Sequence, residues 1–331
     1  MTESNKVRFW LDSYPKVNTQ SRYGTALSKF CDFLEVTPDQ TLKWSLDTIE
    51  DNLLRWKAHM VKELSGNTIK LYLTGVTRWF KFNRKRIEPF DLLKNLSRKG
   101  TFSDYPVSHD DLRKVLDGAR LKHKVAISLI AFAGLRPVDV VTLQYRDIVE
   151  SYKRGDEVLT IQKVHEKTER EYVSFLGYQG TRYLRDYLEL RKSKGEKLTQ
   201  DSYIIPYRGG QMQSQGLRLT IGTIIEATVG KHPTGSDRRK FRPYSLRKYF
   251  RHVVSKLGED TAEYLMGHVR GLESLSAVYN GLRDRHPKAI ERLKEQYITV
   301  LPELETEVGD ISLRTELDEL KKERDLHMEQ G

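Results

Sequence analysis

The sequence has almost no cysteine and no long apolar run. One cysteine, Cys31, in 331 residues excludes an internal disulfide framework and zinc sites of the Cys-x-x-Cys kind. The longest largely apolar stretch spans residues 125–135, whereas a membrane-spanning helix needs about 20 such residues. The polar N-terminal residues contain no secretory apolar segment. These absences predict a soluble intracellular protein located in the cytoplasm.

Positive charge is abundant and unevenly distributed. Lys and Arg number 57 against 46 Asp and Glu, which gives a net charge of +11. Residues 300–331 contain ten acidic and four basic residues, so residues 1–299 carry a net +17. A basic body of this kind favours a polyanionic partner. Hydrophobic residues make up 38% of the chain and charged residues 31%, which is typical of a globular protein.

The chain length predicts two domains, because a domain usually has about 100–200 residues. Apolar residues at helical spacing predict amphipathic helices over residues 16–35, 48–64 and 67–82, the first with Asn18 or Thr19 as its N-cap. We therefore expect a helical domain over residues 1–90 and a basic linker over residues 91–107. A second domain then covers residues 108–299, and an acidic helical tail covers residues 300–331.

The second domain mixes helices with a small sheet. Residues 157–162 and 170–176 are rich in β-branched and aromatic side chains and predict an antiparallel hairpin. Helical patterns cover residues 123–134, 179–192, 217–229, 245–257, 260–267 and 273–295. The predicted fold is thus mainly α with a small antiparallel β-sheet. The tail has heptad-like leucines, which suit either an exposed helix on its own domain or docking into another protomer.

Four separated motifs carry side chains that suit chemistry on a phosphodiester. In the first, a buried helix ends at a glycine and delivers an arginine, with an acid three residues later that can orient it. The others offer a lysine in the hairpin turn, a second arginine, and a histidine followed eleven residues later by a tyrosine. They read Gly134-Leu-Arg136-Pro-Val-Asp139, Glu166-Lys167-Thr168, Tyr244-Ser-Leu-Arg247-Lys248, and Leu265-Met-Gly-His268 with Tyr279.

In this order, the motifs resemble the conserved boxes of the tyrosine recombinase, or phage integrase, family across residues 108–285. Thr-x-x-x-Tyr patterns at residues 19–23 and 68–72 are similar to that family's helical core-binding domain. The resemblance implies a core-binding domain followed by a mixed α/β catalytic domain. It also implies a site-specific recombinase that cleaves and rejoins DNA through a 3′-phosphotyrosine, as in integration or excision of a viral genome or other mobile element.

The resemblance further implies double-stranded DNA attachment sites as partners, a homotetramer on DNA and accessory DNA-bending factors. No metal, ATP or other cofactor and no membrane is implied. The protein would then be associated with the nucleoid, or act in the host cytoplasm if a virus encodes it.

The resemblance assigns a role to each motif residue. Tyr279 is the nucleophile, and Arg136 and Arg247 hold the charged phosphate oxygens with their planar donor forks. Lys167 protonates the departing 5′ oxygen and His268 hydrogen-bonds the scissile phosphate. In addition, Asp139 orients an arginine.

Two departures from the family pattern stand out. Tyr244 occupies a position where most members have histidine, so it can donate a hydroxyl hydrogen bond but cannot act as an imidazole acid or base. This form is similar to that of some archaeal and archaeal-virus integrases. The interval between His268 and Tyr279 is also about two residues longer than usual in the family.

The sequence leaves several alternatives open. Lys163 competes with Lys167 for the hairpin lysine, and Tyr297 competes with Tyr279 for the nucleophile. The rival functions are a type IB topoisomerase-like activity and a catalytically silent, sequence-specific DNA-binding or architectural protein. A metal-dependent nuclease is disfavoured because the acidic residues form no recognisable metal-ligand pattern.

Basic residues in both domains are candidates for contacts to the phosphate backbone, although each taken alone is equally a solvated surface charge. Contacts of this kind make DNA affinity fall steeply with salt. The candidates are Lys70, Arg78, Lys81, Arg84, Lys85 and Arg86 in the first domain and Arg238, Arg239 and Lys240 in the second.

Overall fold

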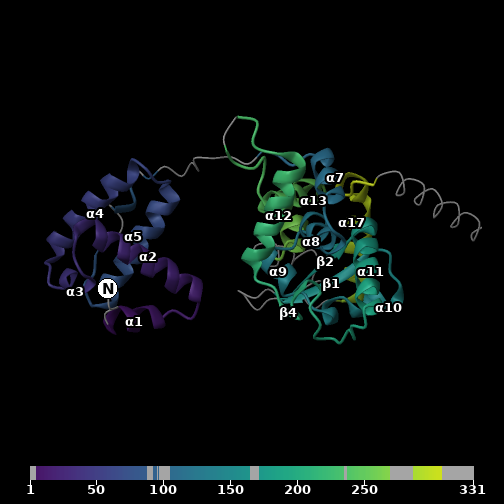
Figure 1. Cartoon of the computed structure of the whole chain (residues 1–331), viewed down its shortest axis with the longest axis horizontal. Coiled ribbons are helices and arrows are strands. Elements are labelled where there is room, and N and C mark those ends of the chain that lie inside the picture. Colours follow the sequence, from purple (N-terminus) through teal and green to yellow (C-terminus); the bar gives the residue numbers. More distant parts are fainter. Residues whose placement is uncertain are drawn as a thin grey trace, which may run out of the picture. The chain divides into compact units, whose positions relative to one another are not determined.

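The computed structural model describes residues 5–87, 92–94, 96, 105–164, 171–234, 237–268 and 286–307 (Figure 1). The chain divides into two compact units, Met1–Ser103 and Asp104–Gly331, each with its own hydrophobic core. Two of the predicted catalytic residues, Lys167 and Tyr279, lie outside the described residues, as do residues 308–331 of the predicted tail.

The first unit is helical throughout its described part. It contains α1 (Asn5–Asp12), α2 (Val17–Leu34), α3 (Pro38–Thr41), α4 (Leu46–Val61) and α5 (Gly66–Phe82). Its core is rich in aromatic side chains, with Trp10, Trp79 and Phe80 fully buried. At Gly75 a Cβ atom would lie 2.9 Å from the Cβ of Ala26, so this glycine lets α5 approach α2 closely.

Side-chain hydroxyls cap some helices of the first unit, but the sequence alone does not identify every N-cap correctly. The hydroxyls of Ser45 and Ser65 cap α4 and α5. The predicted cap of α2 by Asn18 or Thr19 is wrong. The carbonyl of Lys16 accepts from the amide of Thr19 at 2.8 Å, so Lys16 is the N-cap, the helix begins at Val17, and both candidates lie inside its first turn.

The second unit surrounds the apolar helix α8 (Leu121–Ala131), whose residues from Val125 onward are all buried. Helices α11 (Tyr178–Ser193) and α13 (Pro243–Val254) pack directly against it. The predicted hairpin is confirmed as β1 (Leu159–Val164) paired antiparallel with β2 (Glu171–Leu176), in the register Leu159 to Leu176. The other described elements are α7 (His109–Asp117), α9 (Pro137–Val141), η1 (Tyr145–Asp147), α10 (Val149–Arg154), β3 (Pro206–Tyr207), β4 (Gly210–Gln211), α12 (Ser214–Val229), η2 (Ser255–Leu257), α14 (Glu259–Leu265), α17 (Pro287–Thr299) and α18 (Leu301–Leu304).

One predicted helix has the wrong limits. Residues 273–295 do not form a continuous helix, because α17 starts at Pro287 and His286 before it has an extended backbone (φ −60°, ψ 127°). Proline lacks an amide hydrogen and fits the first turn of a helix, where no internal partner exists for that hydrogen. The chain therefore starts a new helix at Pro287.

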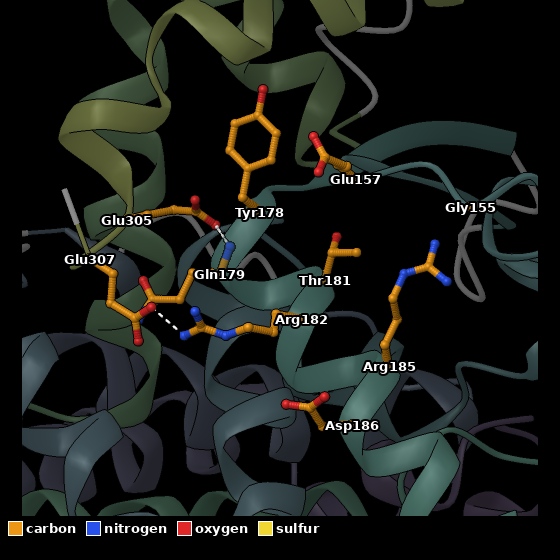
Figure 2. Close-up of a pocket in the computed structure, with 10 residues that line it drawn as sticks. All are labelled: Gly155, Glu157, Tyr178, Gln179, Thr181, Arg182, Arg185, Asp186, Glu305 and Glu307. Atoms are coloured by element: carbon orange, nitrogen blue, oxygen red, sulfur yellow. Dashed lines mark hydrogen bonds and ion pairs between the residues drawn. The ribbon is translucent and has the colours of Figure 1, made fainter. Parts of the chain in front are cut away.

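The segment after α17 belongs to the core of the second unit. Leu301, Leu304 and Glu305 are fully buried. One carboxylate oxygen of Glu305 accepts from the amides of Gln179 (2.9 Å) and Gly180 (3.3 Å) at the start of α11 (Figure 2). Residues 301–307, which the sequence assigns to a separate tail, therefore contact the second unit. The rest of the predicted tail, residues 308–331, lies outside the described residues.

A cavity of about 290 Å³ opens beside the contact between Glu305 and Gln179, at the start of α11 (Figure 2). Basic and acidic side chains line it together, among them Arg182, Arg185, Glu157 and Glu307. None of the predicted site residues lines it. Among the described helices, none is both long and apolar enough to cross a membrane.

Candidate active site

The first arginine motif starts at a turn that requires glycine. Gly134 follows the C-terminal end of α8 with φ +64°, and a Cβ atom there would lie 2.4 Å from the Phe250 ring. Both the left-handed backbone and the close approach of the ring exclude a side chain. The turn leads to Arg136, which occupies the N-cap position of α9.

Asp139 holds Arg136 in two ways. Its Oδ2 accepts from the backbone amide of Arg136 at 3.2 Å and lies 3.6 Å from the guanidinium Nη1. The Tyr172 hydroxyl donates to the same oxygen at 3.3 Å. Asp139 is buried, whereas the Arg136 side chain is 26% exposed. The buried carboxylate thus fixes an arginine that still reaches solvent.

The second arginine lies inside the protein. Arg247, from α13, is 1% exposed, and its guanidinium donates to the carbonyl oxygens of Gly134 and Met266, the latter at 2.7 Å. Burial and the nearby charge of Arg136 lower the pKa of Arg247 to about 10. It therefore remains a cation at neutral pH, and it links the turn after α8 to the end of α14.

His268 lies against this arginine. Its Nε2 is 3.0 Å from Nη2 of Arg247, and its Nδ1 is 2.6 Å from a carboxylate oxygen of Glu263. A guanidinium can only donate, so Nε2 accepts and the proton of the neutral ring resides on Nδ1, which donates to Glu263. Burial, with the charges of Arg247 and Arg136, lowers the pKa of His268 although Glu263 raises it.

Two neighbours of these residues were not singled out in the sequence. Glu263 precedes His268 by five positions at the end of a helix that is followed by glycine, a spacing that could have pointed to it. Tyr172 packs against Gly267, where a Cβ atom would lie 2.8 Å from its ring. Its position opposite Asp139 depends on strand register and is not encoded in any local motif.

Within the described residues, two buried guanidinium nitrogens have no hydrogen-bond partner. They are Nη1 of Arg136 and Nε of Arg247. Buried donors are nearly always paired in folded proteins. Nη1 of Arg136 has an ion pair with Asp139 at 3.6 Å but no hydrogen bond among the residues that the structure describes, so these two buried donors mark a place that suits an anion.

Lys163 and Tyr297, the alternatives for the hairpin lysine and the nucleophile, both have hydrogen-bond partners within the protein. The ammonium of Lys163 donates to the carbonyl of Thr142 at 2.8 Å and to Asp147 at 3.1 Å. Tyr297 is fully buried and its hydroxyl donates to the carbonyl of Phe132 at 2.8 Å. Burial raises the pKa of Tyr297 well above its usual value, which disfavours the phenolate.

The two tyrosines near Arg247 differ in their surroundings. Tyr244 is 52% exposed in the first turn of α13, and the ammonium of Lys248 lies 5.9 Å from its ring centre. Tyr249 is buried, and its hydroxyl donates to the carbonyls of Glu303 and Leu304. Tyr244 is thus accessible, while Tyr249 holds the segment after α17 in place.

The predicted DNA-contacting residues fall into two groups. Some already have partners within the protein: Lys85 donates to the carbonyl of Trp44, Arg239 contacts Glu226 at 3.0 Å, and Lys240 contacts Asp111 at 2.9 Å. Six of the predicted residues are exposed, whether or not they also contact the protein, namely Lys70, Arg78, Lys81, Arg84, Arg86 and Arg238.

On α5, helical spacing puts Lys70, Arg78 and Lys81 on one face. The side chains of Leu73 and Val76 on the same helix are buried. The exposed cations therefore form a stripe along the outside of the first unit.

Comparison with solved structures shows which known proteins have a similar fold. A fragment of lambda integrase, bound as a dimer to a COC′ core site, matches with a TM-score of 0.57 and 17% identity over 79% of this chain and 91% of the other. The Tn1549 transposon integrase, in complex with transposon right end DNA, matches with a TM-score of 0.57 and 17% identity over 87% and 99%. The chain has the tyrosine recombinase fold.

A further tyrosine recombinase structure, the lambda integrase tetramer bound to a Holliday junction, matches with a TM-score of 0.55 at 15% identity, over 80% of this chain and 72% of the other. No protein-family model and no curated protein sequence matches the chain. The similarity is thus one of tyrosine recombinase fold, carried by sequences that have diverged widely.

Proposed function

We propose that this protein is a site-specific DNA recombinase that cleaves and rejoins strands through a 3′-phosphotyrosine. One observation carries the proposal: Arg136, Arg247 and His268, from three motifs far apart in sequence, converge on one partly buried site. The arginines lower the pKa of His268 through their charges, which means that all three groups lie within electrostatic reach of one another.

A scissile phosphate suits this site because its oxygens are hydrogen-bond acceptors for two arginine nitrogens that have no such acceptor in the described part of the chain. Its nonbridging oxygens accept from Nη1 of Arg136 and Nε of Arg247, the buried donors without a partner in the described part of the chain. Negative charge accumulates on these oxygens in the pentacoordinate transition state. Donors fixed in advance stabilise that state more than the ground state.

The covalent step is assigned to Tyr279. Its phenolic oxygen gives its proton to water and forms a bond to phosphorus, while the bond from phosphorus to the 5′ oxygen breaks. Lys167 gives a proton to that departing oxygen. The phosphotyrosine conserves the energy of the broken bond, so the reverse attack by a 5′ hydroxyl rejoins the strand without ATP.

We assign DNA binding to the exposed basic stripe on α5 and, in the second unit, to the exposed Arg238. Exchange between two duplexes cuts four strands, so we propose four protomers in the active assembly. Lambda integrase has been solved as a tetramer on a Holliday junction, which supports this arrangement. Residues 308–331 are proposed to dock on a neighbouring protomer, and a chain ending at Glu307 that still recombines would contradict this.

We further propose that the protein acts as an integrase of a mobile element. A fold shared with phage and transposon integrases supports this proposal. The exposed hydroxyl of Tyr244 takes the place of the usual histidine as a donor to the phosphate.

Covalent trapping in EDTA tests the chemistry. The protein is incubated with DNA carrying its candidate attachment region, denatured with SDS, and compared with Tyr279→Phe and Tyr297→Phe. We expect an adduct with wild type and Tyr297→Phe and none with Tyr279→Phe. Loss only in Tyr297→Phe would move the nucleophile. No adduct on tightly bound DNA would favour a silent DNA-binding protein, and relaxation of supercoils without pairing of sites would favour a topoisomerase.

A further inference from the structure

The carboxylate of Glu263 lies between the imidazole of His268 and the guanidinium of Arg251. Its Oε2 lies 2.6 Å from Nδ1 of His268, and its Oε1 accepts from Nε of Arg251 at 3.0 Å. Its side chain is 17% exposed. Burial works against the charged form, but His268 and Arg251 together keep the pKa of Glu263 below its usual value. Glu263 is therefore a charged acceptor at neutral pH.

The backbone explains why these two residues meet. The helix α14 ends in a Schellman turn, in which the amide of His268 donates to the carbonyl of Glu263 (2.9 Å) and that of Gly267 to Tyr264 (2.7 Å). Gly267 has φ +65°, the left-handed conformation that this turn requires. The turn folds His268 back over the residue five positions earlier. The contact is thus built into the end of the helix and does not depend on a flexible side chain alone.

The opposite edge of the imidazole faces a different environment. Nε2 accepts from Arg247, and the charge of Arg136 also acts on the ring. With Glu263, these are the charged groups whose interactions with His268 the structure resolves. A carboxylate on the Nδ1 side and two guanidiniums on the Nε2 side make the two ring nitrogens unequal. Such second partners commonly fix the tautomer of a functional histidine.

We propose that Glu263 is a positioning residue for strand cleavage, because its carboxylate holds the Nδ1–H of His268 and thereby aims Nε2 at Arg247 and the scissile phosphate. This inference rests on the proposed recombinase function and deepens it. When a phosphate displaces the Arg247 contact, the ring needs a second proton to donate from Nε2. Glu263 then balances the imidazolium charge that this proton creates.

The proposal predicts a direction for pH dependence. Donation from Nε2 requires protonated His268, so cleavage falls as pH rises through the pKa of His268. The charge and hydrogen bond of Glu263 raise that pKa, and their removal lowers it. In Glu263→Gln the fall in rate therefore begins at lower pH, with a loss at pH 7.5 of roughly tenfold for each unit by which the pKa drops.

Glu259→Gln is a matched control. Glu259 lies on the same helix and accepts from the same Arg251, at 2.8 Å, but in the described part of the chain the charged groups that act on His268 are Glu263, Arg247 and Arg136. Both variants remove one carboxylate from α14 and weaken one contact of Arg251. Only Glu263→Gln removes a charge from the histidine. A structural role of α14 alone would affect both variants alike.

The test combines adduct formation at several pH values with ¹⁵N NMR of the histidine rings in the free protein, with His268→Gln identifying the signal. We expect the wild-type His268 pKa and pH profile in Glu259→Gln, and a lower His268 pKa with the profile shifted to lower pH in Glu263→Gln. Glu263→Asp keeps the charge and is expected to recover most of the profile. If Glu263→Gln unfolds by circular dichroism, Glu263→Ala against Glu259→Ala, which also removes one carboxylate at each position, decides in the same way.

Two outcomes would overturn different claims. An identical His268 pKa and pH profile in Glu263→Gln and Glu259→Gln would refute the positioning role while leaving the recombinase function intact. Absence of adduct in wild type and in every variant on bound DNA would refute the proposed function. The NMR measurement would then still determine whether Glu263 fixes the histidine.

Discussion

Replacing Gly134 by alanine tests how the turn after α8 supports the arginine site. A non-glycine residue in the left-handed region costs about 1–2 kcal/mol. The added Cβ would also lie 2.4 Å from the Phe250 ring, which is buried and cannot move aside freely. Overpacking of this kind costs about 1–3 kcal/mol. We expect Gly134→Ala to lower the free energy of unfolding by about 2–5 kcal/mol.

Gly155→Ala separates the two contributions. Gly155 also has a positive φ, +83°, but no atom lies within 4 Å of its Cβ position. This variant keeps the backbone strain and lacks the clash, so we expect a loss of about 1 kcal/mol. In calorimetry of a unit of this size, each 1 kcal/mol lowers Tm by about 2–4 °C. Equal Tm values for the two variants would refute the packing argument.

The Gly134 variant also has a functional consequence. The carbonyl of Gly134 accepts from the Arg247 guanidinium, so a displaced turn displaces the arginine as well. We expect Gly134→Ala to lose covalent adduct formation at temperatures where it is still folded, while Gly155→Ala retains it. Normal adduct formation by folded Gly134→Ala would show that Arg247 keeps its position without this turn.

Three further predictions follow from single contacts. Burial raises the pKa of Glu305 to about 7, above its unfolded value, so its contribution to stability is present at low pH and is lost as pH rises toward 7. The free energy of unfolding measured at pH 5 and at pH 8 should therefore differ less in Glu305→Gln than in wild type. Lys163→Ala should lower Tm by a few degrees through its lost contacts to Thr142 and Asp147, and should still form adduct. Lys167→Ala should form adduct slowly unless the 5′ oxygen is replaced by a better leaving group. Arg78→Ala should reduce the slope of log affinity against log salt by about 1, while Lys240→Ala, whose ammonium is held by an aspartate, should not.

Local sequence signals predicted much of this molecule. The hairpin of β1 and β2 follows from its β-branched and aromatic residues, and the helices follow from apolar spacing. The first and last residues of the helices are less predictable. Pro287 was included inside a long helical pattern because apolar periodicity continues across it, yet the missing amide hydrogen makes it a starting residue. Periodicity detects which face is buried, while capping chemistry decides where a helix begins.

The site shows a similar division. Arg136 and Asp139 are three residues apart, so their contact is local and could be expected. That Arg247 is almost fully buried could not be expected, since its acceptors are carbonyls of Gly134 and Met266, which are remote in sequence. Backbone acceptors have no residue type and leave no motif. The roles of Lys167 and Tyr279 stay predictions, because they rest on motif order and both residues lie outside the described part.

The closure of the second unit by the segment after α17 determines when this site can assemble during synthesis. The ring of His109, at the start of the unit, contacts the carbonyl of Glu305, 196 positions later. Tyr297 reaches back in the same way to Phe132, 165 positions earlier. Contacts so distant in sequence form late in folding. The arginine site is therefore completed only after residues 297–305 have been synthesised, and shorter chains lack the buried scaffold that orients its cations.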